Sequence, residues 1–429
     1  MFINQRLKKN DLFKYKENIK PLLILILMVV SCKIPKPIAG NKINFSHFNH
    51  LYKEINFHEK DVGIIHIYSE YPDYQFEIEP DEGFACVDDA TRALVLLSTY
   101  IKAHKNDLEA YDKLKKLTKF VLQMQHKNGY FNNFIKIDLS INTTYRTSVA
   151  EANWWSFRAL WGLESAYELL RFDKAVAGTI EMAVTKLLMA IKRDIPICGT
   201  ATKVIKKVEV PTWLPQQSAA DQSALLILGL LKNYKRTGDA HVKKLIDILA
   251  KGIMVMQKGD ANKYPYGVFL SWQNQWHAWG NSQAYALLKA GQQFNNQDYI
   301  NSALKEVDNF YPYVLKNGFA ESFWIKKNED TSFTEINRNQ YPQIVYGLRP
   351  MIWTSLEAYR YSKKEKYMTL ATALAQWLQG QNDAKSIIYH PNTGICYDGI
   401  IGNNKVNKNS GAESTIECLL ILLEMDKLK

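Results

Sequence analysis

Two kinds of helical segment alternate along this chain from residue 44 to its end. One kind is apolar around nearly its whole circumference and must be buried on nearly every side. The other carries one apolar stripe opposite a lysine-rich face, which is typical of a surface helix. The apolar segments are expected at about 86–101, 150–170, 219–234, 278–291, 345–361 and 411–425, and the amphipathic ones at about 44–58, 107–126, 174–193, 239–257, 297–316 and 364–380. The alternation predicts six hairpins, each with an outer and an inner helix.

The lengths of the links favour a closed ring of these hairpins. Links from an outer to the next inner helix are long, whereas links from an inner to the next outer helix are short. Long loops in a compact domain are usually functional, and in a ring they would all gather where the inner helices begin. We therefore predict an all-α fold, an (α/α)6 toroid over residues 44–429. An open solenoid of helical hairpins is the alternative, although its links are usually short.

The first 31 residues have the layout of a secretory signal peptide. A basic region precedes a short apolar run at 22–30, which is shorter than the about 20 residues that a membrane span needs. Val29-Val30-Ser31-Cys32 also resembles a bacterial lipobox, in which the cysteine is lipid-modified and becomes the N-terminus. We expect a lipoprotein signal at 1–31, lipidation of Cys32 and a tether at 32–43. An ordinary signal peptide with an incidental cysteine is the alternative.

The residue after Cys32 favours one membrane over another. Lys33 stands there rather than an aspartate, which by analogy with Gram-negative lipoproteins favours the outer membrane. Such a protein would face the periplasm or the cell surface.

Charge and cysteine content exclude some classes of function. Removal of the signal lowers the formal net charge from +11 to about +7. The excess lysines are spread over helix surfaces without a dense basic block and interleaved aromatics, so nucleic acid is not an expected partner. The remaining cysteines form no CxxC or His/Cys metal cluster, and their pairing stays open: Cys86, Cys198, Cys396 and Cys418. We expect no metal, no other cofactor and a monomer.

Acidic residues stand at the beginning of several apolar segments. The first such segment opens with Asp88 and Asp89, and the last opens with Glu413. First-turn carboxylates cap helices and fit the positive end of the helix dipole, and Asp88 can pair with Arg92 one turn later. The same acids could instead face a substrate at the rim of the ring. Glu413 would then approach Asp88 and Asp89, because the first and last inner helices are neighbours in a closed ring.

Two short motifs resemble those of a known superfamily. Asp88-Asp89-Ala90-Thr91-Arg92-Ala93 and Asn409-Ser410-Gly411-Ala412-Glu413-Ser414-Thr415 resemble helix starts in bacterial helical domains of the six-hairpin glycosidase superfamily. The resemblance covers residues 44–429 and implies an (α/α)6 toroid with a carbohydrate cleft at one end. The superfamily includes glycoside hydrolases, unsaturated-uronyl hydrolases, lyases and epimerases. The chain matches no single catalytic pattern among them.

Paired carboxylates at the rim would suit glycoside hydrolysis. That reaction needs one carboxyl group as acid and a second as base or nucleophile on opposite sides of the scissile bond. We expect Asp88 or Asp89, together with Glu413, to supply the pair. Glu151 and Asp221 begin the second and third apolar segments, where each either takes part in the site or caps its helix. We keep Glu151 as a reserve catalytic residue and Asp221 as a substrate-binding one.

Aromatic residues are concentrated in or beside the long links. The flat faces of sugar rings stack on aromatic rings, while sugar hydroxyls bond to carboxylates and amides. We expect substrate contacts from Trp154, Trp276, Trp279 and Trp324, and from Arg92. Trp154, early in its helix, could equally belong to the core.

These features together predict an exported, lipid-anchored protein that acts on an oligo- or polysaccharide, as a glycoside hydrolase. A lyase, uronyl hydrolase or epimerase on the same fold is an alternative. Arginines that would suit an acidic sugar are available at Arg92, Arg146, Arg158, Arg338 and Arg349. A non-catalytic glycan-binding lipoprotein is a further alternative. The sugar, the linkage and the stereochemical course are left open.

Overall fold

The computed structural model describes residues 43–195 and 199–428. The predicted signal peptide, the lipidation site at Cys32 and the tether lie outside these residues, apart from Ile43, and so does Cys198. None of the helices in the described ranges is both long and apolar enough to cross a membrane.

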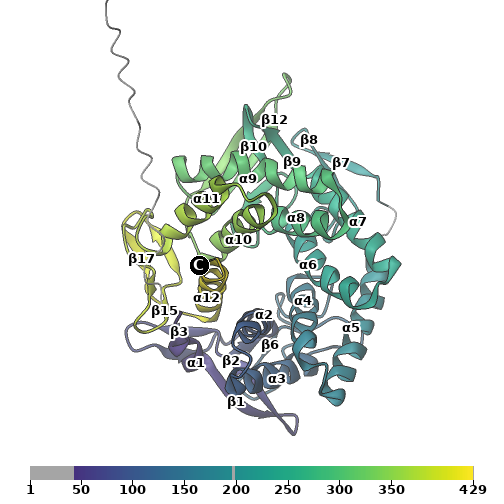
Figure 1. Ribbon diagram of the computed structural model, residues 1–429, viewed down its shortest axis with the longest axis vertical. Helices are drawn as coiled ribbons and strands as arrows, with labels where there is room; N and C mark the ends of the chain where they lie inside the picture. The colour runs from purple at the N-terminus through teal and green to yellow at the C-terminus, as the bar shows by residue number, and fades with distance from the viewer. Residues whose placement is uncertain (1–42, 196–198, 429) are drawn as a thin grey trace, which may run out of the picture. The chain divides into compact units, whose positions relative to one another are not determined.

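Six inner helices surround a common centre (Figure 1). Each packs against the next around the ring, and the last packs against the first, so the ring is closed. Their bounds are α2 (Val87–Ala103), α4 (Trp154–Leu170), α6 (Ala220–Thr237), α8 (Gln283–Phe294), α10 (Val345–Ser362) and α12 (Ala412–Asp426). The inner helices are buried on most sides, as their apolar composition requires. The predicted (α/α)6 toroid is confirmed.

Within residues 43–195 and 199–428, five outer helices cover the inner ones, and each follows its inner helix after a short link. They are α3 (Leu108–Gln123), α5 (Lys174–Asp194), α7 (Ala240–Val255), α9 (Gln297–Asn317) and α11 (Glu365–Ala375), the last continued by a 3-10 turn at Gln376–Leu378. Each buries one stripe only. In α3, for example, Leu114, Leu117 and Val121 are fully buried, whereas the lysines are only half-buried.

The predicted outer helix at 44–58 is wrong over most of its length. Only α1 (Ser46–Leu51) is helical, and β1 (Tyr52–Phe57) pairs antiparallel with β2 (Lys60–Ile65). His58 and Glu59 both have positive φ, as the two-residue turn of a tight hairpin requires. The hairpin buries Val62, Ile64 and Ile65 and packs β2 against α3.

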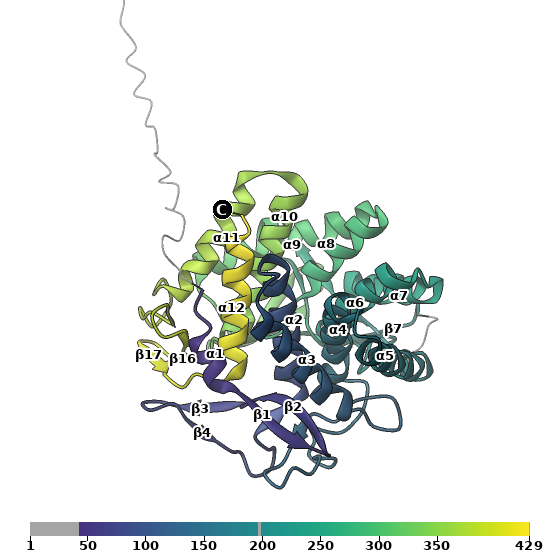
Figure 2. The ribbon, with the colours of Figure 1, turned by 60° about the horizontal axis from the view of Figure 1, so that its bottom comes forward.

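The long links are built largely of short antiparallel hairpins, which the sequence pattern did not predict. Hairpins satisfy the backbone hydrogen-bonding groups of segments that pack against the ring. Figure 2 shows α12 rising from the end where the strands gather. The strands are β3 (Tyr68–Glu70), β4 (Gln75–Glu77), β5 (Ala85–Cys86), β6 (Phe134–Ile135), β7 (Thr202–Ile205), β8 (Val208–Pro211), β9 (Gln257–Asp260), β10 (Lys263–Phe269), β11 (Gln275–His277), β12 (Ser322–Lys327), β13 (Phe333–Asn339), β14 (Tyr389–His390), β15 (Ile395–Cys396), β16 (Gly399–Gly402) and β17 (Lys405–Asn407).

Two glycines set the close approach of the first three inner helices. A Cβ on Gly162 of α4 would lie 2.9 Å from the Cβ of Thr91 on α2. A Cβ on Gly229 of α6 would lie 2.7 Å from Cγ of Leu160 on α4. The absence of a side chain therefore lets neighbouring helices touch, and this contact fixes the relative positions of the residues at their N-terminal ends.

Candidate active site

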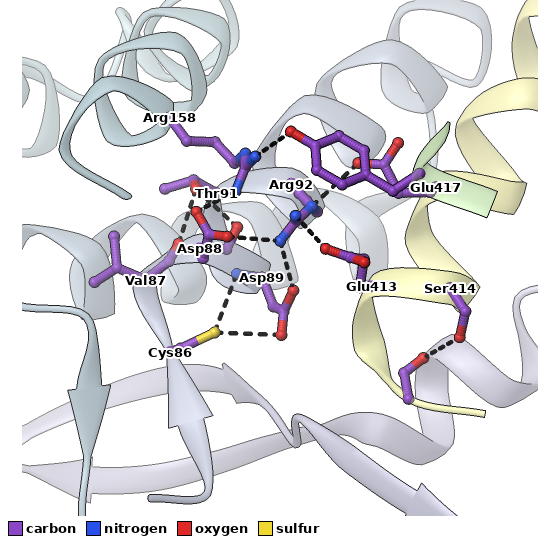
Figure 3. Close-up of polar contacts among 12 residues, drawn as sticks. Cys86, Val87, Asp88, Asp89, Thr91, Arg92, Arg158, Glu413, Ser414 and Glu417 are labelled. Carbon is purple, nitrogen blue, oxygen red and sulfur yellow. Dashed lines mark hydrogen bonds and ion pairs between the residues drawn. The ribbon is translucent and has the colours of Figure 1, made fainter. Parts of the chain in front are cut away.

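Arg92 lies at the centre of four carboxylates where α2 meets α12 (Figure 3). Its Nη1 lies 3.0 Å from Oδ2 of Asp88 and 2.9 Å from Oδ1 of Asp89. Its Nη2 lies 2.5 Å from Oε2 of Glu413, and its Nε lies 3.1 Å from Oε1 of Glu417. Spacings of three and four residues put both aspartates on the same side of α2 as the arginine. We call these five residues the Arg92 cluster.

A second arginine binds the other oxygen of Asp88. Arg158 of α4 pairs with Oδ1 of Asp88 and donates a hydrogen bond of 2.5 Å to the hydroxyl of Tyr346. Burial alone would raise the pKa of Asp88, but Arg158 and Arg92 outweigh it, and the net effect lowers this pKa. Asp88 is therefore held as an anion whose side chain is 20% exposed.

Glu413 is the most exposed acid of the Arg92 cluster, with 39% of its side-chain surface accessible. Protein atoms packed around the carboxyl group still remove much of its hydration, and this loss raises its pKa to about 7. The charges of Asp89 and Glu417 raise the pKa further, while Arg92 opposes the shift. Glu413 can therefore exchange a proton near neutral pH.

An aspartate that the sequence motifs did not single out positions the start of α12. Oδ1 of Asp398 accepts hydrogen bonds from the Gly411 amide at 2.8 Å and from Ser414 Oγ at 2.6 Å. These bonds satisfy groups at the helix start. Asp398 thereby holds the turn that carries Glu413.

Asp89 points away from the exposed part of the cluster. Its side chain is 5% exposed. Its Oδ2 accepts a hydrogen bond from the Cys86 thiol at 3.2 Å, and the sulfur accepts one from the Asp89 amide at 3.3 Å. Burial raises the pKa of Asp89, although Arg92 opposes the shift. The two adjacent aspartates thus have different surroundings, as the about 100° between successive helical side chains would require.

Glu417 extends the cluster along the ring. It lies one turn after Glu413 and bonds through its second oxygen to Nε of Arg349. Both side chains are 1% exposed. The Arg349 guanidinium in turn stacks on Trp353, at 4.7 Å from the ring centroid. Sequence reasoning missed Glu417 as a functional candidate. A carboxylate inside an otherwise apolar helix was the available signal, because such a charge needs a partner.

A histidine completes the part of the site formed by α4, α6 and the link before α8. His277 Nε2 lies 2.8 Å from Oδ2 of Asp221, and His277 Nδ1 lies 2.8 Å from the carbonyl oxygen of Trp279. A carbonyl oxygen only accepts hydrogen bonds, so Nδ1 carries a proton. The Trp279 ring stacks on the imidazole at 3.9 Å, and the Trp154 ring lies 6.5 Å away.

Trp154 and Tyr346 connect this histidine to the Arg92 cluster. A Cβ on Gly280 would lie 2.6 Å from Cη2 of Trp154 and 3.0 Å from the Tyr346 hydroxyl, so both side chains flank that glycine. The Arg158 guanidinium lies 5.3 Å from the Tyr346 ring and 6.0 Å from the Trp154 ring. Arg158 therefore contacts both the aromatic residues and Asp88.

The structure places three other predicted site residues elsewhere. Trp276 is 2% exposed and packs among core aromatics, with Phe323 at 5.0 Å. Trp324 is half-buried on β12. Glu151 is exposed in the link before α4 and accepts a hydrogen bond from Asn153. Among the contacts of the described residues, none joins these three side chains to the Arg92 cluster.

The site has no metal-ligand set within the described ranges. No group of three or more histidine, cysteine, aspartate or glutamate side chains there is arranged to hold a metal ion. The Arg92 guanidinium occupies the position between the carboxylates. Cys86, Cys396 and Cys418 are buried free thiols.

No protein-family model and no curated protein sequence matches the chain. Solved structures do match it. A sugar epimerase from a ruminal bacterium gives a TM-score of 0.61 at 12% identity, over 89% of this chain and 96% of that one. A D-mannose isomerase gives 0.55 at 13% identity, over 82% and 93%. A family 76 glycoside hydrolase from a bovine Bacteroides thetaiotaomicron strain gives 0.54 at 10% identity, over 87% and 75%.

This chain has the (α/α)6 fold that these solved structures share. The expectation drawn from the two motifs is thereby confirmed at the level of the fold. These enzymes differ in reaction, and at such low identity the likeness is one of fold. The finer resemblance carried by the motifs stays a prediction.

Proposed function

We propose that this protein is a glycoside hydrolase in which Glu413 is the general acid and Asp88 is the partner carboxylate. One observation carries the proposal. Asp88 and Glu413 bind the same Arg92 guanidinium, yet the pKa of Asp88 is lowered and that of Glu413 is raised. Pairs of carboxyl groups whose surroundings separate their pKa values supply an acid and an anion at the same pH.

The distance between these two groups fits glycoside hydrolysis. Asp88 and Glu413 bond to the two terminal nitrogens of the same planar guanidinium, so the bonded oxygens lie within about 8 Å of each other. Retaining enzymes hold their carboxyl groups about 5 Å apart and inverting enzymes about 6.5–9.5 Å apart. A separation of up to about 8 Å is compatible with both the retaining and the inverting course.

The roles follow from the protonation states. Protonated Glu413 donates its proton to the glycosidic oxygen as the bond from that oxygen to the anomeric carbon breaks. Asp88 remains anionic because Arg92 and Arg158 bind it, and it stabilises the positive charge that develops on the sugar. The anomeric carbon then bonds either to water or, in a retaining course, first to Asp88; in that course water next attacks the anomeric carbon, and its bond to Asp88 breaks. A proton returns from the attacking water to the carboxylate that acts as base.

The aromatic residues of the site support a saccharide substrate. Trp154 and Trp279 are half-buried and lie beside His277 and Asp221. Such surfaces combine ring faces with hydrogen-bonding groups, as sugars require. The similar solved structures are a sugar epimerase, a sugar isomerase and a glycoside hydrolase by their descriptions. They support the same class of substrate.

The test is hydrolysis of a panel of oligosaccharides. The release of reducing ends measures the rate. We expect Glu413→Gln and Asp88→Asn to lower kcat by about 10²-fold or more. The control is Glu151→Gln, because Glu151 is exposed and makes no contact with the Arg92 cluster. Binding of oligosaccharides without cleavage by the parent protein would favour a glycan-binding role instead. Equal rates for Glu413→Gln and the parent would refute the assigned acid.

Sugar epimerisation is a second candidate because of the His277–Asp221 pair beside Trp154. An imidazole can move a proton at a sugar carbon. Both nitrogens of His277 are bound, to Asp221 and to the Trp279 carbonyl, so this role requires one of the two bonds to open. Incubation of a disaccharide in D2O separates the two reactions, since an epimerase yields a deuterated epimer and a hydrolase yields monosaccharides. The uronate-directed alternatives gain less support, because Arg92, Arg158 and Arg349 are all bound to protein carboxylates.

We also propose export and anchoring in the outer membrane through a lipid on Cys32. The apolar run at 22–30 and the lipobox-like sequence before Cys32 support this. Cys32→Ala should move the protein from the membrane fraction to the soluble fraction and abolish labelling with a fatty acid. An unchanged membrane fraction with no labelling of the parent would contradict a lipid anchor.

A further inference from the structure

A cavity of about 320 Å³ lies at the end of the ring where the inner helices end. All six inner helices contribute to its lining. Its lining includes Lys102 near the end of α2 and Glu424 near the end of α12. It lies on the far side of the ring from Asp88 and Glu413, which stand in the first turns of the same two helices. Its volume is in the range of small-ligand sites.

The charges around this cavity are unbalanced. Four lysines line it, namely Lys102, Lys232, Lys235 and Lys289, against the two acids Glu168 and Glu424. Glu424 is also bound by Arg360 and Lys427, which lie outside the lining, so much of its charge is already matched. Glu168 is shared by Lys102 and Lys232. Lys289 is in turn bound by Glu357, which also lies outside the lining. The lining itself still holds four lysines against two acids, an excess of positive charge.

The favourable effect of cations at the C-terminal ends of helices explains only part of this excess of positive charge. Cations stabilise the last turn of a helix, and Lys235 stands in the last turn of α6. Lys232 precedes that turn, and the last turn of α8 contains no basic residue, so Lys289 also precedes it. Burial lowers the pKa of Lys232, and the charges of Lys102 and Lys235 lower it further while Glu168 opposes them. A bound anion would relieve this repulsion.

An unpartnered polar group and an aromatic floor complete the cavity. Ser98 lines it and is 2% exposed, and its Oγ has no hydrogen-bond partner among the described residues. Buried hydroxyl groups rarely lack a partner, so this one is available to a ligand. Trp161 and Trp353 meet edge to face at 6.2 Å, and Tyr285 lies 5.4 Å from Trp353. These rings also belong to the lining.

We propose that this cavity binds a small organic anion, with its carboxylate or phosphate group held by Lys232, Lys289 and Ser98 and its ring packed on the aromatic floor. Lysine ammonium groups bind such anions as point charges, and the serine hydroxyl donates a hydrogen bond to an anionic oxygen. An acidic sugar or a sugar phosphate has both parts. The site is separate from the one assigned to hydrolysis and does not depend on that assignment.

The experiment is a titration at constant ionic strength with sodium glucuronate, inorganic phosphate and, as the neutral match, glucose. Calorimetry measures the affinity, and tryptophan fluorescence detects a change around Trp161 and Trp353 of the aromatic floor. We expect saturable binding of one or both anions and none of glucose. The stronger of the two identifies the anionic group that the cavity prefers. Lys289→Gln and Lys232→Gln should each weaken binding by about tenfold or more.

Two further variants separate this site from others. Lys244→Gln changes an exposed lysine on the outer helix α7 and should bind like the parent. Glu413→Gln should also bind like the parent, because Glu413 is at the other end of the ring. Since Lys289 is 39% exposed, its variant should fold even if Lys232→Gln does not. Absence of saturable binding of either anion, or equal affinity in Lys289→Gln, would overturn the proposal.

Discussion

Nη2 of Arg92 on α2 and Oε2 of Glu413 on α12 lie 2.5 Å apart, although 321 residues separate them in the sequence. This ion pair joins the first and last inner helices where the ring closes. The same arginine binds Asp88, so one side chain bridges the closure of the ring and binds both carboxylates of the proposed pair.

The pH dependence of hydrolysis should follow the two opposite pKa shifts. Glu413 must be protonated to act as acid, so kcat/KM should fall as pH rises through about 7. Asp88 must be ionised, and its lowered pKa should keep activity down to pH values below the usual carboxylate range. Rates measured across pH on one cleaved substrate test this. A descending limb that persists unchanged in Glu413→Gln would assign it to another group.

Loss of Arg92 should destabilise the fold strongly. Arg92→Met leaves Asp89 and Glu417 buried without this cation, which typically costs about 3–5 kcal/mol. Arg92→Lys should recover only part of this, because an ammonium lacks the planar fork that binds several carboxylates. Urea unfolding gives the free energies. Arg193→Met is the control, since its ion pair with Asp194 is exposed and should matter little. A similar small effect for both arginines would contradict the role given to Arg92.

Glu306 on α9 should make the fold less stable as pH rises. Burial raises its pKa to about 8, although the Phe269 amide and the Tyr311 hydroxyl bond to it. Below the unfolded-state value of 4.5 both states hold the proton. Between that value and about 8 only the folded state holds it, so the free energy of unfolding falls with pH.

The matched comparison is Glu306→Gln against Glu329→Gln, because Glu329 is exposed. As pH rises from 4.5 to 8, the free energy of unfolding of Glu306→Gln should increase relative to that of the parent, on the order of a few kcal/mol. Thermal or urea unfolding at several pH values measures the difference. A constant difference between Glu306→Gln and the parent across that range would show that Glu306 ionises normally.

Gly280→Ala should disturb the aromatic part of the site. Gly280 has φ of +71°, and an added Cβ would lie 2.6 Å from the Trp154 ring. Both effects displace Trp154, so oligosaccharide affinity should fall by about tenfold. Gly178→Ala on α5 is the control, because nothing lies within 4 Å of its added Cβ. That variant should be stabilised by about 0.5–1 kcal/mol with unchanged affinity. Unchanged affinity in Gly280→Ala would remove Trp154 from the binding surface.

The sequence was sufficient for most of the helices and for the order of the inner helices around the ring. Hydrophobic periodicity is a local property, and it predicted α2 and α12 to within one or two residues. It failed for residues 52–57, because six residues with mixed polarity fit a strand as well as a helix, and pairing with β2 decided between them. It also failed for Trp276, since a tryptophan beside a link can point into the core as readily as toward a ligand.

The sequence by itself determined which residues are acidic, aromatic or apolar and at which end of the ring the acids stand. Only the tertiary structure decided that Asp88 binds two arginines and stays ionised, while Glu413 loses hydration and holds its proton near neutral pH. It also decided that Glu417 meets Arg349 and that His277 meets Asp221. Charge state and reactivity depend on neighbours brought from distant helices, and hydrophobic periodicity carries no information about those neighbours.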